Sequence, residues 1–369
     1  MPIEKIANRQ LFFIHFMMRT TIVVAFLPVL TSADAAQDAW VAVLITFVGT
    51  ELLVLTISAL AARFPQQTAI QYSQKLLGPF LGKLVSSIYL WAFLHMASCD
   101  VRIYGEAIVN GFLPETPLAF IIGGMVLAAT VAACAGVEVI GRLADLLFLG
   151  FLSMLLFSLI TPLPLLNLAL LEPVLARGLR PVLEASLVPV AVGAQALFLT
   201  ILTPHLDQPR LVVRTAFWAV AASSLVLLLT ALLVVGVLGP DIGSHSIYPF
   251  FRMIRAIEVS VFLGRVEAPI MFAWGFGLFI GIATFVYSGA KGLSQWLGLS
   301  DYRGIIWPMA AICVVLSIHS FEDIFLLETY MSPPYVGSHA LAFTLIPQGI
   351  LWAFYGFTLL KTSKKAADK

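Results

Sequence analysis

The stretch of sequence that decides the fold is residues 185–204, ASLVPVAVGAQALFLTILTP. It carries no charged residue and is long enough to cross the hydrocarbon core of a bilayer, which takes about 20 residues of α-helix. Pro189 and Gly193 lie inside it, and either residue can interrupt helical hydrogen bonding. The stretch therefore predicts a membrane-crossing helix that is broken near its middle.

Nine further apolar stretches accompany this one. The 369-residue chain is 60% hydrophobic and only 11% charged, whereas soluble domains carry about 25% charged residues. No water-soluble fold can hide so much apolar surface, so we predict an all-α integral membrane protein with one membrane domain covering residues 1–369. The ten predicted transmembrane helices are residues 10–31, 39–62, 84–110, 118–134, 143–161, 185–204, 211–239, 266–288, 304–319 and 340–360.

The basic residues outside these stretches are unevenly distributed. Fourteen Lys and Arg residues lie in the two terminal tails and the even-numbered loops, and five lie in the odd-numbered loops. Because positively charged loops stay in the cytoplasm, this distribution predicts that both termini are cytoplasmic, as an even number of crossings requires.

Ten helices divide into two halves of five with inverted topology. Transporters built in this way bind substrate near the membrane midplane, where the first helix of each half is interrupted. In this chain those helices contain Arg19-Thr20-Thr21 and the Pro189–Gly193 segment, so we expect a 5+5 inverted repeat with broken helices 1 and 6. Two ordinary kinked helices are the alternative.

Three charged residues inside the apolar stretches are candidates for ligand binding or proton coupling. Arg19 and Glu51 lie at similar depth in the first two helices, and we expect them to form an ion pair or to share a polar network. Asp100 lies in the third helix. A charge in the membrane is costly and is expected to be paired or hydrated. The alternatives are a static ion pair for Arg19 and Glu51, and a simple hydrogen bond from a neighbouring polar side chain for Asp100.

Other patterns indicate helix packing. Arg102 and Glu106 are four residues apart on the third helix and can pair with each other. Gly277 and Gly281 form a GxxxG motif, which lets another helix approach closely. The sequence contains no nucleotide-binding, hydrolase or metal-ligand motif, so we expect no enzymatic activity, no cofactor and no metal. A net charge of +1 argues against nucleic acid as a partner.

A set of short segments follows a definite order and spacing along almost the whole chain. These segments are Arg9-Gln10-Leu11-Phe12-Phe13, Gln37-Asp38-Ala39-Trp40, Phe64-Pro65, Tyr72-Ser73, Leu77-Gly78, Leu81-Gly82-Lys83, Leu113-Pro114-Glu115-Thr116-Pro117, Gly136-Val137-Glu138-Val139-Ile140-Gly141-Arg142, Tyr248-Pro249-Phe250-Phe251, Arg265-Val266-Glu267 and Trp274. In their order and spacing the chain resembles the spore germination permease family, the B subunits of nutrient germinant receptors, within the amino acid/polyamine/organocation superfamily.

This resemblance implies a LeuT-like fold in the spore inner membrane and a role in sensing a small germinant, commonly an amino acid. It also implies two partners, a larger receptor A subunit and a C-subunit lipoprotein. The ligand pocket would lie at the breaks in helices 1 and 6, walled by helices 3 and 8. The chain departs from the family pattern in having Thr20-Thr21 where glycine is usual, and Ala194-Gln195 where glutamate often follows Gly193.

For the pocket we expect the positive N-terminal end of a half-helix to hold a ligand carboxylate. The predicted substrate-binding residues are Thr20, Thr21, Tyr104, Gly193, Gln195 and Trp274. Three functions remain open. The chain is a receptor subunit that binds a germinant and signals germination, a proton-coupled amino-acid transporter that uses Glu51 or Asp100, or a structural subunit with a vestigial pocket.

Overall fold

A computed structural model describes residues 4–25, 35–244, 246, 248–256, 267–321, 326, 329–330 and 332–367. Within these residues the regular elements are helices, and the only β pairing is an isolated bridge between Ile6 and Leu206. The longer elements are α1 (Asn8–Ala25), α3 (Ala39–Arg63), α4 (Ala69–Gly111), α5 (Leu118–Ala135), α6 (Val137–Ile160), α7 (Leu179–Val192), α9 (Val212–Leu238), α12 (Glu267–Leu297), α13 (Arg303–His319) and α16 (Ile346–Ala367). The shorter ones include the 3-10 segment η4 (Gly193–Phe198), α8 (Leu199–Leu202), α10 (Pro240–Ser244), α11 (Pro249–Arg255), α15 (Pro333–Ala340) and the π-helical segment η8 (Leu341–Leu345).

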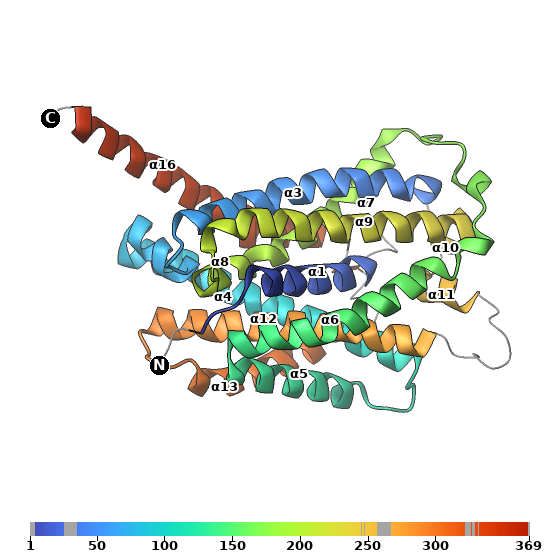
Figure 1. Ribbon diagram of the computed structural model, residues 1–369, viewed down its shortest axis with the longest axis horizontal. Coiled ribbons are helices and arrows are strands. Elements are labelled where there is room, and N and C mark those ends of the chain that lie inside the picture. The colour runs from blue at the N-terminus through green and yellow to red at the C-terminus, as the bar shows by residue number, and fades with distance from the viewer. Residues whose placement is uncertain are drawn as a thin grey trace.

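The long helices run side by side in one bundle (Figure 1). Eight helical segments in the described part of the chain are long and apolar enough to span a membrane. The prediction of ten requires α1 and α13 as well. Helix α13 is apolar but has only 17 residues, and α1 has 18 residues, two of which are arginine. The described N-terminal residues and the end of α16 lie at the same, left-hand end of the bundle (Figure 1).

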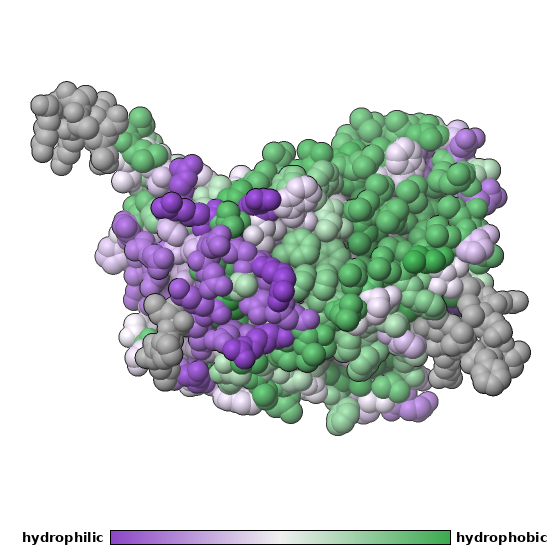
Figure 2. Space-filling model, viewed as in Figure 1, coloured by the Kyte–Doolittle hydropathy of each residue, from purple (hydrophilic) through white to green (hydrophobic). Residues whose placement is uncertain are grey.

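The outer surface has the composition expected of a protein solvated by lipid. Hydrophobic residues cover the middle and right of the visible face, and hydrophilic residues gather at the left-hand end (Figure 2). Large side chains such as Leu52, Phe120 and Leu149 are more than half exposed on their helices. A soluble monomer rarely exposes apolar patches of this extent, so the molecule is a multi-pass integral membrane protein.

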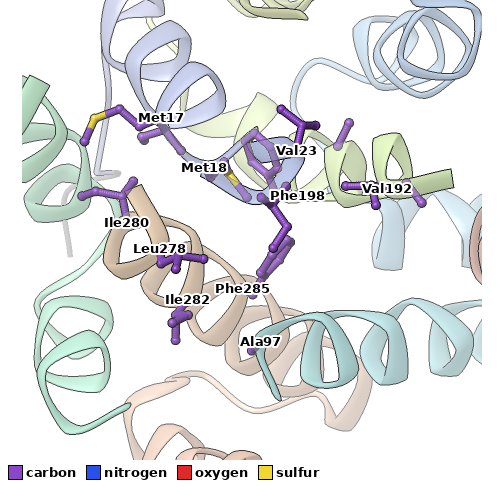
Figure 3. Packing of buried hydrophobic residues seen from close by; sticks show 14 of the residues in the cluster. Met17, Met18, Val23, Ala97, Val192, Phe198, Leu278, Ile280, Ile282 and Phe285 are labelled. Carbon is purple, nitrogen blue, oxygen red and sulfur yellow. The ribbon is translucent and has the colours of Figure 1, made fainter. Parts of the chain in front are cut away.

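The most buried of the candidate spans are α12 and the segment from Leu179 to His205. Figure 3 shows their side chains with those of α1: Met18, Phe198 and Phe285 converge where α1, the Leu179–His205 segment and α12 meet. Helix α12 also packs on α4, α5 and α6, and α3 packs on α7 and α9. The centre of the bundle is therefore a packed apolar core.

The first helix differs from the prediction. Arg19, Thr20 and Thr21 lie within the uninterrupted α-helix α1, so the break expected at these residues is absent. The physical reason is local, because Thr21 Oγ1 donates back to the carbonyl oxygens of Met17 and Met18, each at 2.9 Å, and leaves the backbone ladder intact. Residues 26–31 of the first predicted span, and residue 266 of the eighth, lie outside the described residues.

The sixth span changes its helix type at the predicted place. Helix α7 contains Pro189 and ends at Val192, and the chain continues as the 3-10 segment η4 from Gly193 before returning to α-helix at Leu199. Proline removes one backbone donor, and a 3-10 segment has three residues per turn in place of 3.6. The segment therefore reorients the side chains that follow Gly193, without unwinding the backbone.

Two other helices begin or continue differently from the predicted spans. The element α4 consists of two helices that meet at Gly78, whose φ of 82° and ψ of 174° are not helical. The first begins at Ala69, where Thr68 and Gln71 form a capping box, and the second begins at Pro79, a few residues before the predicted start at residue 84. The last span, predicted for residues 340–360, consists of α15, η8 and α16 in succession, so helix begins at Pro333.

Candidate functional site

A hydrogen bond between two of the predicted residues defines the candidate site. Gln195 in η4 donates from Nε2 to Asp100 Oδ1 of α4 at 2.9 Å. Asp100 is buried, with 3% of its surface exposed, and it forms no ion pair within the described part of the chain. Gln195 reaches α4 because the 3-10 turn after Gly193 changes the direction of its side chain. The contact joins the interrupted span to a long neighbouring helix.

Asp100 and Gln195 lie on the wall of a cavity of about 70 Å³ between α4, the α7–η4 segment and α15–η8. A cavity of this size has room for several water molecules. Most of its wall is apolar, and its other lining residues are His95, Met96, Cys99, Ile103, Ala191, Val192, Ala194, Tyr330, Val336, His339, Ala340 and Phe343. The buried carboxylate and the amide are thus polar groups in a largely apolar chamber.

Two histidines form one wall of this cavity. The rings of His95 and His339 are nearly parallel, with centroids 5.1 Å apart, and His95 Nε2 lies 2.6 Å from the Tyr330 hydroxyl. His339 Nδ1 lies 2.7 Å from the carbonyl oxygen of Tyr335. Sequence reasoning did not assign His339 and Tyr330 to the site, because they lie more than 200 residues from His95 and meet it only through packing. The sequence offered one signal for this wall of the site, namely His339, which immediately precedes the last predicted span.

Three further predicted residues line a second, smaller cavity of about 20 Å³ between α1, α6, α11 and α12. Here Trp274 Nε1 donates to the Thr21 carbonyl oxygen at 2.9 Å, and Thr20 also contributes to the wall. The ring of Tyr104 stacks on Trp274 with centroids 6.4 Å apart. Thr20, Thr21 and Trp274 thus do not share one cavity with Asp100 and Gln195.

Gly193 faces a different neighbour. A Cβ atom at this residue would lie 3.0 Å from Thr50 Cγ2 of α3 and 3.4 Å from Leu53 Cδ2. Gly193 therefore permits close packing of the interrupted span on α3, while the next two residues, Ala194 and Gln195, line the larger cavity.

The predicted direct ion pair between Arg19 and Glu51 is not formed. Arg19 Nη2 donates to Thr50 Oγ1 at 3.2 Å, and neither carboxylate oxygen of Glu51 has a hydrogen-bond partner. Both side chains are more than nine-tenths buried. The Nε atom of Arg19 and the Nδ1 atom of His15, one helical turn away, also lack partners. These groups form a polar cluster with unsatisfied hydrogen-bonding capacity between α1 and α3.

The pairing of Arg102 with Glu106 is confirmed. Arg102 Nη2 lies 2.7 Å from Glu106 Oε1, and Arg102 Nη1 also donates to the carbonyl oxygens of Ser317 and Ile318. These carbonyls lie near the end of α13, where helical carbonyl oxygens lack intrahelical partners. The buried pair therefore fastens α4 to α13 and belongs to the scaffold.

The packing role of the GxxxG motif is also confirmed. A Cβ atom at Gly277 would overlap Thr21 Cγ2 and lie 2.7 Å from the Met17 carbonyl oxygen, and one at Gly281 would lie 3.2 Å from Met18 Cβ. The motif thus lets α12 approach α1 closely. Gly281 is also close to the site, since its Cβ position is 3.8 Å from Asp100 Oδ2.

Solved structures with a similar architecture include transporters. The crystal structure of MhsT in complex with L-phenylalanine superposes with a TM-score of 0.66 at 14% identity, covering 92% of this chain and 89% of MhsT. A mutant of the manganese transporter from Eremococcus coleocola gives a TM-score of 0.56 at 15% identity, covering 93% of this chain and 77% of that protein. At these identities the likeness concerns the fold, which is LeuT-like as predicted.

The fold and the intramembrane site define a multi-pass membrane protein of transporter architecture. The chain belongs to the spore germination protein family, which it matches over residues 5–323. It is 28% identical over 292 residues to spore germination protein KB of Bacillus subtilis, covering 77% of each chain. It is 25% identical over 303 residues to spore germination protein YndE of the same organism, covering 80% of this chain and 82% of that one.

Proposed function

We propose that this chain is the membrane subunit of a spore germinant receptor, and that the cavity beside Asp100 and Gln195 binds a small nutrient germinant. Membership of the spore germination protein family supports the first part of the proposal. The observation that carries the second part is the hydrogen bond of 2.9 Å that joins the interrupted span to α4 at the wall of the cavity.

The chemistry of the cavity favours a ligand with an ammonium group, and an amino acid is the first candidate. Asp100 has one hydrogen-bond partner and no cationic neighbour among the described residues. A buried carboxylate without a counter-charge is costly inside a membrane, so a cationic ligand or a proton stabilises it. The apolar part of the wall, including Ile103, Val336 and Phe343, suits an apolar side chain.

Ligand binding can signal only if it favours one of two arrangements of the protein. Asp100 belongs to α4, whereas Gln195 belongs to the 3-10 segment of the interrupted span. A ligand whose ammonium group donates to Asp100 and which also hydrogen-bonds to Gln195 changes the contact between the two residues, and thereby the position of the span relative to α4. We propose that a receptor A subunit and a C-subunit lipoprotein in the spore inner membrane detect this change.

The mode of carboxylate binding differs from the one expected from the sequence. Within the described residues, the backbone from Leu179 to His205 stays helical and α1 is uninterrupted from Asn8 to Ala25, so these two segments show no free half-helix N-terminus beside the cavity. We propose that side chains on the cavity wall recognise the ligand, with Asp100 as the group that pairs with its ammonium.

The test of this function is germination of spores that lack the gene for this chain. The wild-type gene should restore germination by one class of nutrient from a panel of amino acids, nucleosides and sugars. The Asp100→Asn variant should be made in equal amount and should fail to restore it. A deletion strain that responds normally to every nutrient would contradict the receptor function.

A second function, proton-coupled amino-acid transport, is favoured by one specific observation. Both carboxylate oxygens of Glu51 are buried and unpartnered, and a proton is the smallest species that could satisfy them. Proteoliposomes containing the purified chain would then take up amino acid when a proton gradient is applied, and Glu51→Gln would abolish that uptake. Absence of uptake by the wild-type protein, with ligand binding intact, would leave the receptor function alone.

A further inference from the structure

A groove on the outside of the bundle lies apart from both cavities described above. It runs between α4, α12 and α13 and has a volume of about 340 Å³. Its walls are formed mainly by Leu90, Trp91 and Leu94 of α4, Leu293 of α12, and Pro308 and Ile312 of α13. The part of α4 that lines it, from Ser87 to Leu94, is about 10 Å long at 1.5 Å per residue.

The groove exists because the three helices do not close on one another there. Gly289 of α12 contributes no side chain to the floor, and the end of the Met309 side chain lies in the space beside it. On the outer side, Trp91 is 46% exposed and Ile312 is 49% exposed. Helices α4 and α12 are long and apolar enough to span the membrane, and α13 is a shorter apolar helix packed beside them. The groove therefore opens toward the lipid phase.

A lysine lies at one end of the groove, on the same wall. Lys83 precedes Ser87 by one helical turn on α4, and its ammonium nitrogen lies 4.9 Å from the ring centroid of Trp296, which lines the groove. Trp296 Nε1 and Ser87 Oγ both donate to the Lys83 carbonyl oxygen, at 3.0 and 2.9 Å. Lys83 is exposed and has no carboxylate partner in the described part of the chain.

We propose that this groove binds an anionic phospholipid, with an acyl chain between α4, α12 and α13 and the phosphate group at Lys83. The apolar walls match an acyl chain, and the uncompensated lysine matches a phosphate. Tryptophan is the residue typical of the boundary between hydrocarbon and headgroups, so Trp296 marks the depth at which the headgroup lies. Basic pockets between membrane helices are a recurrent way of holding anionic headgroups.

A lipid fits the groove better than a helix of another protein does. A helix with its side chains is about 10–12 Å wide, whereas the groove follows α4 for only about 10 Å, roughly two helical turns, which is too short to pack a membrane-spanning helix along its length. The lysine at the end matches a phosphodiester group, which carries one negative charge in phosphatidylglycerol. The site is separate from the germinant cavity and does not depend on the proposed function.

The experiment compares lipid retention by the full-length protein in nanodiscs that contain equal amounts of phosphatidylglycerol and phosphatidylcholine. Native mass spectrometry counts the lipids that stay bound to the protein after it is released from the nanodisc. The wild-type protein should retain phosphatidylglycerol in preference to phosphatidylcholine. Lys83→Gln should lower the ratio of retained phosphatidylglycerol to phosphatidylcholine about fivefold. The matched control is Lys75→Gln, because Lys75 also packs on an aromatic ring at 5.8 Å, that of Phe64, but does not line the groove.

A second variant tests the acyl-chain part of the site. Gly289→Leu must displace the end of the Met309 side chain, which lines the groove, and so takes up space there. It should reduce the number of retained lipids of both kinds, and its folding is checked by size-exclusion chromatography and thermal unfolding. Equal preference in the wild type and in Lys83→Gln would overturn the headgroup assignment. Unchanged retention in a folded Gly289→Leu protein, or disulfide cross-linking of Ser87→Cys to a membrane helix of another receptor subunit, would overturn the lipid assignment.

Discussion

Gln195 and Asp100 lie 95 residues apart in the sequence, yet the amide of one donates to the carboxylate of the other at 2.9 Å. The bond links the 3-10 segment of the interrupted span to α4 at the edge of the larger cavity. In this contact a predicted charged residue meets a predicted substrate-binding residue. Variants that remove this hydrogen bond can be tested separately for stability and for ligand binding.

Replacement of Gln195 by alanine should lower stability moderately. The substitution leaves the Asp100 carboxylate without its hydrogen-bond donor, and an unsatisfied buried acceptor costs about 1–3 kcal/mol. Thermal unfolding of the purified variant in detergent measures the loss. Asn167→Ala is a suitable control, because its side chain caps an exposed 3-10 turn with a single hydrogen bond. An unchanged melting temperature for Gln195→Ala would show that the bond is absent in solution.

Replacement of Trp274 by phenylalanine should act on packing and leave ligand binding unchanged. The variant loses the indole donor to the Thr21 carbonyl oxygen but keeps a ring to stack on Tyr104. We expect a loss of about 1 kcal/mol in stability and a normal ligand response. A variant of normal stability that no longer responds to ligand would instead place the site in the smaller cavity beside Thr20 and Thr21.

The close approach of α12 to α1 predicts a strong effect at Gly277. A methyl group there must push Thr21 and the Met17 carbonyl oxygen away, and overpacking of this kind costs about 1–3 kcal/mol. Gly123→Ala is the matched control, since a Cβ atom at Gly123 meets nothing within 4 Å. Thermal unfolding should show a loss for Gly277→Ala and almost none for Gly123→Ala. Equal melting temperatures would contradict the close contact.

Two ion pairs with the same spacing should respond differently to mutation. Glu106→Gln leaves the buried Arg102 without its counter-charge, which costs about 3–5 kcal/mol, whereas Glu138→Gln breaks the exposed pair with Arg142 and costs at most about 1 kcal/mol. The comparison requires both variants in the same detergent, with unfolding followed by circular dichroism. Similar losses for both variants would contradict the scaffold role of the buried pair.

The class of protein and most of its helices could be predicted because hydropathy and charge distribution can be read directly from the order of residues along the chain. Arg102 and Glu106 were also predictable, since a separation of four residues places them on one helix face. The contact of Gln195 with Asp100 was not, because it depends on how the 3-10 segment rotates its side chains against a distant helix. Each of the two residues was a candidate, but nothing in the sequence paired them.

Two expectations depended on local contacts that composition does not reveal. Thr20 and Thr21 were expected at a helix break, but the Thr21 hydroxyl bonds back to its own helix, which tolerates it without a break. Gly193 was expected to line the pocket, but it packs on Thr50 of α3. A glycine in an interrupted helix can serve either purpose, and only the neighbouring helix decides between them.

The most direct test of the central claim is a thermal-shift measurement on the purified protein in detergent with amino acids, nucleosides and sugars. The wild type should be stabilised by members of one chemical class, with amino acids expected first. Asp100→Asn should lose this stabilisation, and Glu51→Gln should keep it, because both variants remove a buried carboxylate but only Asp100 lines the cavity. Equal stabilisation of wild type and a folded Asp100→Asn protein would contradict the claim that this cavity binds the germinant.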